Sequence, residues 1–128
     1  MLLRVLHERG NLAVVKRPVA PEHEMAAVIA ALDGQPVLFE RPSNSAYQVA
    51  ANLVAWRDTV ALGLGTTPGQ LLGRLVEAYR CPSAPAQVAH PPCQEVVEPA
   101  VDLEALPILT HGPRDAGPYV TAGVAVIV

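Results

Sequence analysis

Four side chains of metal-binding type lie in the last third of the sequence: Cys81, His90, Cys93 and His111. Thiolate and imidazole groups are the ligands that structural zinc prefers in proteins. Zinc-binding sequences usually pair these ligands as Cys-x-x-Cys or His-x-x-x-His, and neither pair occurs here. Ordinary loop residues are therefore the favoured interpretation, and a zinc site is the alternative.

His111 and Asp115 could supply the base and the orienting carboxylate of a hydrolase triad, which would also need a serine or threonine nucleophile. The sequence contains no Gly-x-Ser-x-Gly elbow to present such a nucleophile. Asp115 precedes Ala116 and Gly117, and an aspartate in such a turn commonly accepts hydrogen bonds from backbone N–H groups. The sequence therefore favours a turn residue over a catalytic carboxylate.

The glycine-rich segment "LGLGTTPG", residues 62–69, precedes an expected helix and resembles an anion-binding loop. It lacks the Gly-Lys-Ser/Thr ending of a nucleotide-binding loop, and Gly-x-Gly spacing alone is a weak signal. We expect Thr67 to be an N-cap and Pro68 the first helical residue. Taken residue by residue, the sequence offers no complete catalytic set.

Length, composition and charge limit the classes of protein to which this chain can belong. The 128 residues suffice for one domain with a core, and the core must use small side chains because 51% of residues are hydrophobic but only 4% are aromatic. The net charge of −3 and scattered basic residues give no reason to bind nucleic acid or an anionic membrane. Without an apolar run of spanning length or a secretory signal, we expect a cytoplasmic protein whose Cys81 and Cys93 are free thiols.

Hydrophobic periodicity and the positions of Gly and Pro predict the elements that position these residues. Helices are expected over 2–9, 21–33, 56–65 and 68–80, and strands over 11–17, 35–42 and the first half of 45–55. The last two strands should run side by side. In the second helix, Met25, Val28, Ile29 and Leu32 form the apolar side, whereas the fourth helix uses Leu71, Leu72, Leu75, Val76 and Tyr79. We therefore predict an α+β domain over residues 1–80, with a small mixed sheet and flanking helices.

Residues 81–118 differ from the preceding residues in composition, because eight of the 13 prolines lie between Pro82 and Pro118. Proline disrupts helix interiors and central strands, so we predict an extended arm that crosses a surface. Only residues 93–99 are long enough for a strand, and residues 101–107 suit a helical turn. After the arm, residues 119–128 are mostly small or β-branched and carry no polar side chain after Thr121, which predicts an apolar strand that needs neighbours on both faces.

The segment "VDLEALPILTHGPRDAGPYVTAGVAVIV" resembles the UbiD family of decarboxylases. In that family an Asp-Leu…Leu-Pro segment leads through a His and an Asp-Gly/Ala-Gly-x-Tyr turn into a strand. Further pieces that precede this segment also occur in the family's order, namely "LHERGNLAVVKRPVAPEHEMAAVIAAL", "PVLFE", "NLVAWRDTVALGLG" and "PPCQEVV". Their colinearity over nearly the whole sequence makes the resemblance specific.

The resemblance implies a reversible, non-oxidative decarboxylase that acts on aromatic, heteroaromatic or α,β-unsaturated carboxylic acids. Its cofactor would be prenylated FMN, with a divalent metal (Mn or Mg) and K⁺ at the cofactor phosphate. The cofactor would carry the difficult chemistry, while the protein orients and protonates. Residues 119–128 would then be the first strand of an incomplete split β-barrel that binds the flavin.

The resemblance also assigns residues. Thr121 matches a position that lines the cofactor pocket, with Gly123 beside it for close approach, whereas His111, Asp115 and Tyr119 match the motif that shapes the turn. The family's metal-binding and catalytic residues follow this strand and have no match here. We therefore expect the chain alone to bind no cofactor, and to need the remainder of a UbiD-like enzyme, or a second subunit that completes the barrel, within an oligomer. The alternative is a noncatalytic subunit that binds a larger partner by β-strand addition.

Overall fold

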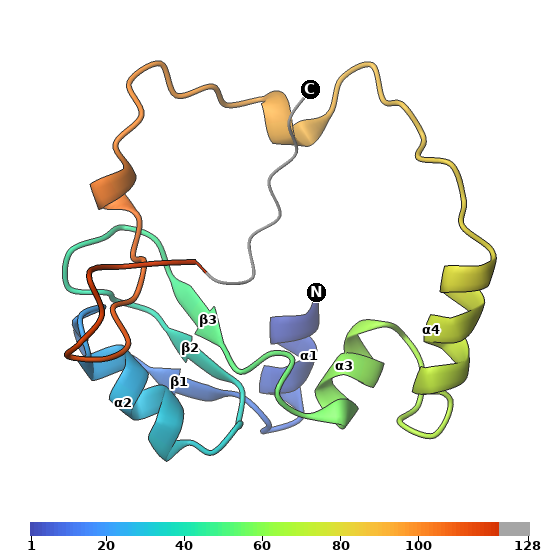
Figure 1. The fold of residues 1–128 in the computed structure, drawn as a ribbon, viewed down its shortest axis with the longest axis horizontal. Helices are drawn as coiled ribbons and strands as arrows, with labels where there is room; N and C mark the ends of the chain where they lie inside the picture. Colours follow the sequence, from blue (N-terminus) through green and yellow to red (C-terminus); the bar gives the residue numbers. More distant parts are fainter. Residues whose placement is uncertain (121–128) are drawn as a thin grey trace.

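The computed structural model describes residues 1–120, with the side chain of Cys93 excepted. This part of the chain contains four α-helices and a three-stranded mixed sheet, so the predicted α+β class is confirmed (Figure 1). None of its helices is both long and apolar enough to cross a membrane. The elements are α1 (Leu2–Glu8), β1 (Ala13–Val15), α2 (Glu24–Ala31), β2 (Val37–Phe39), β3 (Val49–Ala51), α3 (Arg57–Gly63), α4 (Leu71–Arg80) and the 3₁₀ turns η1 (Pro92–Gln94) and η2 (Leu103–Ala105).

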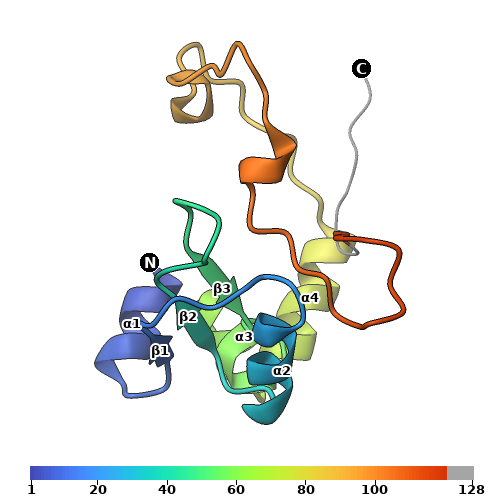
Figure 2. The same ribbon diagram turned by 90° about the vertical axis from the view of Figure 1, so that its left-hand side faces the viewer.

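The sheet has the order β1-β2-β3. Strands β1 and β2 are parallel, with Ala13 opposite Val37, and β2 and β3 are antiparallel, with Val37 opposite Ala51. A parallel pair needs a crossover between its strands, and α2 provides it by lying over one face of the sheet (Figure 2). The predicted pairing of the second and third strands is confirmed, although β3 begins at Val49 rather than near Ser45.

The core lies between α2 and the sheet. Met25 from α2 and Val37 and Phe39 from β2 are fully buried together with Val19. Val37 and Phe39 point to the same face because strand side chains alternate, and each buried side chain of this size contributes about 1.5–3 kcal/mol. Val28, Ile29 and Leu32 pack against the same core, which confirms the predicted apolar side of the second helix.

Glycines end helices α1 and α2 as predicted. Gly10 and Gly34 have positive φ angles of 70° and 87°, a conformation that glycine adopts without strain. Gly34 also lies under the indole of Trp56, since a Cβ added at this glycine would be 2.6 Å from the Trp56 Nε1. The bare backbone of Gly34 therefore allows the chain before α3 to pack against the end of α2.

The predicted starts of α2 and α4 are wrong. Helix α2 begins at Glu24 rather than Pro21, because the preceding His23 has a φ of 59° that no α-helix contains. Helix α4 begins at Leu71 rather than Pro68, because residues 67–70 form a separate turn in which the Gln70 N–H donates to the Thr67 carbonyl. The Thr67 hydroxyl bonds to the side-chain amide of Gln70 at 3.0 Å and so caps no helix.

The arm that follows α4 loops away from the α+β body and returns to it (Figures 1 and 2). Residues 81–90 and 94–106 are exposed, apart from the undescribed Cys93 side chain between them. Residues 94–99 form no strand, whereas the predicted helical turn within 101–107 is present as η2, where the Asp102 carboxylate accepts from the Glu104 N–H at 2.9 Å. Near the end of this exposed stretch, the Ser45 hydroxyl donates a hydrogen bond to the Ala105 carbonyl at 2.7 Å and so ties the arm to the body.

Candidate functional site

Residues 107–120, here called the return segment, bring the chain back to the start of α2 and lead directly to Thr121 and Gly123. Thr110 pairs with Glu22 in an isolated parallel bridge. The His23 N–H donates to the Thr110 carbonyl at 2.9 Å, and the Thr110 N–H donates to the Pro21 carbonyl at 3.3 Å. Leu109 packs against the hydrophobic core. The return segment is therefore attached to the body by both backbone pairing and apolar contact.

A tight turn follows this attachment. The Asp115 carboxylate accepts from the Gly112 N–H at 2.7 Å, and the Asp115 N–H donates back to the Gly112 carbonyl at 3.1 Å. The prediction that Asp115 accepts backbone hydrogen bonds in a turn is confirmed. No hydrogen bond joins Asp115 to His111 within residues 1–120, so the described side chains give no support to a hydrolase triad.

His111 and Tyr119 close the base of this turn. Their rings lie 5.5 Å apart between centroids with an interplanar angle of 40°, a tilted contact typical of aromatic pairs. The Tyr119 N–H also donates to the Leu109 carbonyl at 3.4 Å. These contacts hold the two ends of the turn together. They also fix the position of Tyr119, two residues before Thr121.

His23 is the residue of this region that the sequence prediction missed. Its φ of 59° is unusual for any residue other than glycine, and such a conformation costs about 1–3 kcal/mol unless its surroundings impose it. Its Nε2 lies 3.2 Å from the Gly112 carbonyl oxygen, so its backbone and its ring both bind the return segment. The only sequence signal was a histidine next to Glu22 and Glu24, where a regular helix start was expected.

A surface cleft of about 460 Å³ lies between the start of α2 and the return segment. Glu22 and Asp115 contribute its acidic groups, and no lysine or arginine is among its described lining residues. The lining residues are Pro21, Glu22, His23, Asn44, Ile108, Thr110, Pro113, Asp115, Ala116, Gly117 and Pro118. A carboxylate or phosphate would meet negative charge here, so the cleft does not fit an acidic substrate or a flavin phosphate.

Glu24 fixes the chain that enters α2. Its Oε2 accepts from the Ala20 N–H at 2.8 Å, and its Oε1 lies 2.7 Å from the guanidinium of Arg17. The Ala20 hydrogen bond and then Arg17 lower the pKa of the Glu24 carboxyl below its ordinary value of 4.5. Glu24 is therefore an anionic support of the loop that carries His23.

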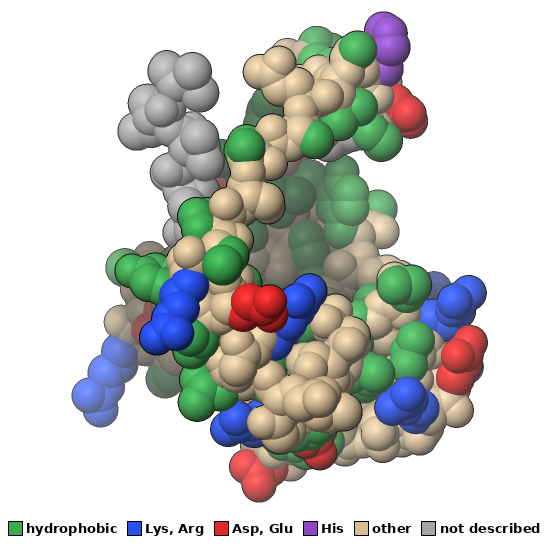
Figure 3. Space-filling model, turned by 90° about the vertical axis from the view of Figure 1, so that its right-hand side faces the viewer, with side chains coloured by type: hydrophobic (Ala, Val, Ile, Leu, Met, Phe, Trp, Pro, Cys, Tyr) green, Lys and Arg blue, Asp and Glu red, His purple; other side chains and the backbone are tan. Residues whose placement is uncertain are grey.

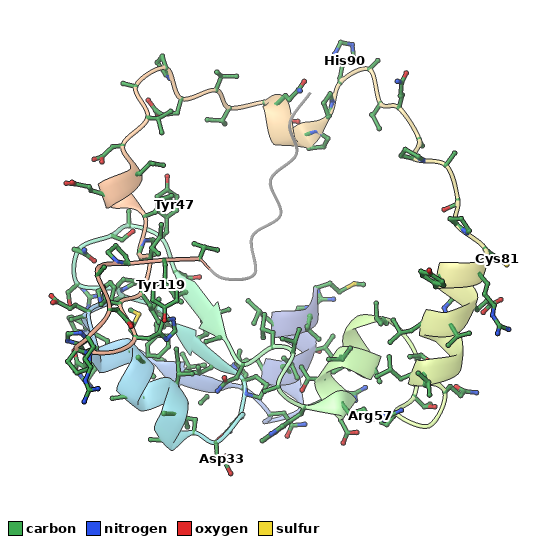
Figure 4. The ribbon with its side chains drawn as sticks, in the orientation of Figure 1. Asp33, Tyr47, Arg57, Cys81, His90 and Tyr119 are labelled. Atoms are coloured by element: carbon green, nitrogen blue, oxygen red, sulfur yellow. The ribbon has the colours of Figure 1, made fainter. Side chains whose placement is uncertain are left out.

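The candidate metal ligands do not assemble within the described part of the chain. The Cys93 side chain lies outside the described part, and the other side chains of residues 1–120 include no group of three or more His, Cys, Asp or Glu that could hold a metal ion. Cys81 directly follows α4, whereas His90 lies far along the arm (Figure 4). The cofactor-binding candidates Thr121 and Gly123 lie outside the described residues and stay predictions.

The glycine-rich segment 62–69 uses its backbone donors internally. The N–H groups of Leu64, Gly65 and Thr66 donate to carbonyls of α3, and Gly65 has a φ of 63° that ends this helix. The Gln70 N–H is occupied by Thr67. A phosphate loop needs free N–H groups that converge on the anion, so the structure favours a helix end followed by a turn.

Comparison with known families agrees with these elements. Residues 3–79 match the 3-octaprenyl-4-hydroxybenzoate carboxy-lyase N-terminal domain, and residues 84–128 match the Rift-related domain of the same carboxy-lyase. The chain belongs to the UbiD family. The predicted resemblance is therefore confirmed, and the boundary between the two matched domains falls where α4 gives way to the arm.

Individual UbiD relatives are longer than this chain. The anhydromevalonate phosphate decarboxylase of Methanosarcina mazei is 38% identical over 122 residues, which cover 94% of this chain and 28% of the relative. The UbiD-class enzyme HmfF from Pelotomaculum thermopropionicum, solved in complex with prFMN, superposes with a TM-score of 0.84 at 34% identity and is covered to 30%. Vanillic acid decarboxylase from Sedimentibacter hydroxybenzoicus gives a TM-score of 0.77 at 26% identity and 28% coverage.

The match to HmfF extends beyond the body. It covers 94% of this chain, a share that cannot be reached without the arm and the return segment. The path of the arm is thus common to this chain and to a UbiD-class enzyme that contains more than three times as many residues as the matched part.

Proposed function

We propose that this chain is the N-terminal portion of a UbiD-class carboxy-lyase. The reaction would be the reversible, non-oxidative decarboxylation of an aromatic or α,β-unsaturated carboxylic acid with prenylated FMN. The observation that carries the proposal is the shared arrangement of body, arm and return segment with HmfF in complex with prFMN, at a TM-score of 0.84. Relatives named as decarboxylases of vanillic acid and 3,4-dihydroxybenzoic acid support an aromatic acid as substrate.

The described residues do not fit the cofactor phosphate with its divalent metal and K⁺. They include no metal-binding group of three side chains, and the cleft beside the return segment is acidic. In this proposal the remaining portion of the enzyme holds the flavin, the metal and the catalytic residues. This chain provides a scaffold and, through Thr121 and Gly123, one wall of the cofactor pocket.

Residues 119–128 would enter the flavin-binding barrel as its first strand, completed in the same polypeptide or by a second subunit. The hydrogen bonds of Thr110 to Pro21 and His23, and of Tyr119 to Leu109, support this role because they fix the position from which residue 121 begins. A displacement of only about 1 Å at the wall of a cofactor pocket can lower activity by about two orders of magnitude. Hydrogen bonds that hold the residues before position 121 in place would therefore support catalysis.

The test is to produce the chain in cells that make prenylated FMN, together with the remaining portion of HmfF, and to analyse the product by native mass spectrometry. The proposal expects a complex that contains flavin and releases CO₂ from an aromatic carboxylic acid. A stable complex that lacks flavin and turnover would contradict the enzymatic role and favour a noncatalytic binding subunit. The remaining portion of HmfF without this chain is the control.

A further inference from the structure

Helix α4 presents an apolar stripe that the described residues leave largely exposed. The side chains here called the α4 stripe occupy positions i, i+3, i+4 and i+7 and so lie on one side of the helix, namely Leu72, Leu75, Val76 and Tyr79. All four are exposed, and Tyr79 reaches 89% of full exposure, whereas Leu71 alone is buried in the body. A helix with this pattern normally buries its apolar side against another element.

The arm carries a second set of uncovered apolar side chains. Val88, Val96, Val97 and Val101 are all exposed, with Val96 at 83%. The arm is nevertheless fixed at both ends, by the Cys81 N–H bond to the Glu77 carbonyl and by the Ser45 bond to Ala105. Figure 3 shows a hollow between the arm and the body with hydrophobic side chains inside it. Exposed apolar surface that spans two neighbouring segments indicates an interaction site.

The charge of the arm restricts what can cover it. Residues 81–113 contain no lysine or arginine and carry the acids Glu95, Glu98, Asp102 and Glu104. All four acids are exposed. A complementary partner would combine an apolar centre with a border of lysine and arginine, because buried interface charges need opposite charges. The same charges disfavour pairing of the arm with the arm of a second copy.

We propose that the α4 stripe and the arm form one docking surface for the flavin-binding portion of a UbiD polypeptide, the part beyond the 30% of HmfF that this chain covers. The inference rests on the proposed function. Its support is that the path of the arm is shared with HmfF although the described hydrogen bonds of residues 94–104 all lie within the arm and none reaches the body. A path that the body does not enforce, yet which recurs in the longer enzyme, is explained by a partner that fills the hollow.

The experiment measures binding of the 128-residue chain to the remaining portion of HmfF by light scattering after size-exclusion chromatography and by titration. We expect a one-to-one complex. The double variants L75D/Y79D and V96D/V97D should each weaken it about tenfold or more, since each places charge on buried apolar area. The E95K/E98K variant should weaken binding at low salt and reduce its salt dependence. Circular dichroism checks that each variant folds.

Val54→Asp is the matched control, because Val54 is equally exposed at 82% but lies in the turn between β3 and α3. It should leave binding unchanged. Equal loss of binding with V54D and the docking variants would overturn the proposal, and so would absence of any complex with the unmodified chain. Self-association that the same variants abolish would also overturn it, by making a second copy the occupant.

Flavin content and turnover separate this inference from the proposed function. A complex that is sensitive to the docking variants but lacks flavin and turnover would support the docking surface and contradict the enzymatic role. An active, flavin-containing complex that tolerates every docking variant would support the enzymatic role and overturn the docking surface.

Discussion

Helices α2 and α4 differ in both composition and surroundings. Helix α2 is rich in alanine and lies over the sheet with Met25 fully buried, whereas α4 has a continuous leucine, valine and tyrosine stripe and leaves it exposed. The helix with the stronger apolar pattern is therefore the less covered one. The apolar side of a helix indicates that another element should cover it. In the described body the sheet covers α2, whereas most of the apolar side of α4 stays exposed.

The contrast between the covered helix α2 and the exposed helix α4 is tested most strongly in the core between α2 and the sheet. Phe39→Ala should reduce the free energy of unfolding by about 3–5 kcal/mol, because it removes a fully buried aromatic ring and leaves a cavity between α2 and the sheet. Urea denaturation followed by circular dichroism measures this loss. A loss below about 1 kcal/mol would mean that the body does not depend on this core, and the contrast with α4 would disappear.

The return segment is attached to the covered body by hydrogen bonds, and Asp115→Ala tests how far its turn depends on one of them. Loss of the bond from the Gly112 N–H should cost about 0.5–2 kcal/mol, the usual range for a side chain that satisfies a backbone donor. Hydrogen exchange should show faster opening of residues 110–119 while the sheet stays protected. Asp115→Asn retains an acceptor oxygen and should behave more like the unmodified chain.

A smaller effect should follow from Glu24, which supports the loop before α2. The pKa of its carboxyl is lowered in the folded chain, so its stabilising contribution is present above pH 4.5 and is lost as the pH falls through the folded-state pKa. Glu24→Gln should therefore lower the Tm at neutral pH, and the difference from the unmodified chain should shrink in acid. A constant difference across this range would exclude the carboxylate as its cause.

The smallest change is expected on α4. Leu75→Ala should alter the stability of the isolated chain by no more than about 0.5 kcal/mol, because the side chain is exposed and leaves no cavity. The same urea measurement used for Phe39→Ala gives the comparison directly. A loss near 2 kcal/mol would show that the α4 stripe is already covered in the chain alone.

Much of the α+β body could be predicted from the sequence, because its signals are local. The apolar periodicity around Met25 and the glycines at positions 10 and 34 place α1 and α2, and the pairing of β2 with β3 follows from their proximity along the chain. The UbiD resemblance, carried by the order of several motifs, is confirmed by the matched domains.

The errors occur where distant residues decide the local conformation. Pro21 suggests a helix start, but its carbonyl and the N–H of His23 pair with Thr110 and hold His23 at a positive φ. Pairing across this separation leaves no periodic trace in the sequence. For α4 the apolar pattern was identified, but no pattern within a single helix shows where its covering surface comes from.

The contact between His23 and Gly112 joins residues 89 positions apart. Closing a loop of this length costs on the order of 4 kcal/mol of chain entropy, so local contacts should form before it does. During synthesis α2 and the sheet can fold as soon as they emerge, while the return segment must wait for the whole arm. The segment that leads to Thr121 and Gly123 should thus reach its native position late in folding, on a body that is already complete.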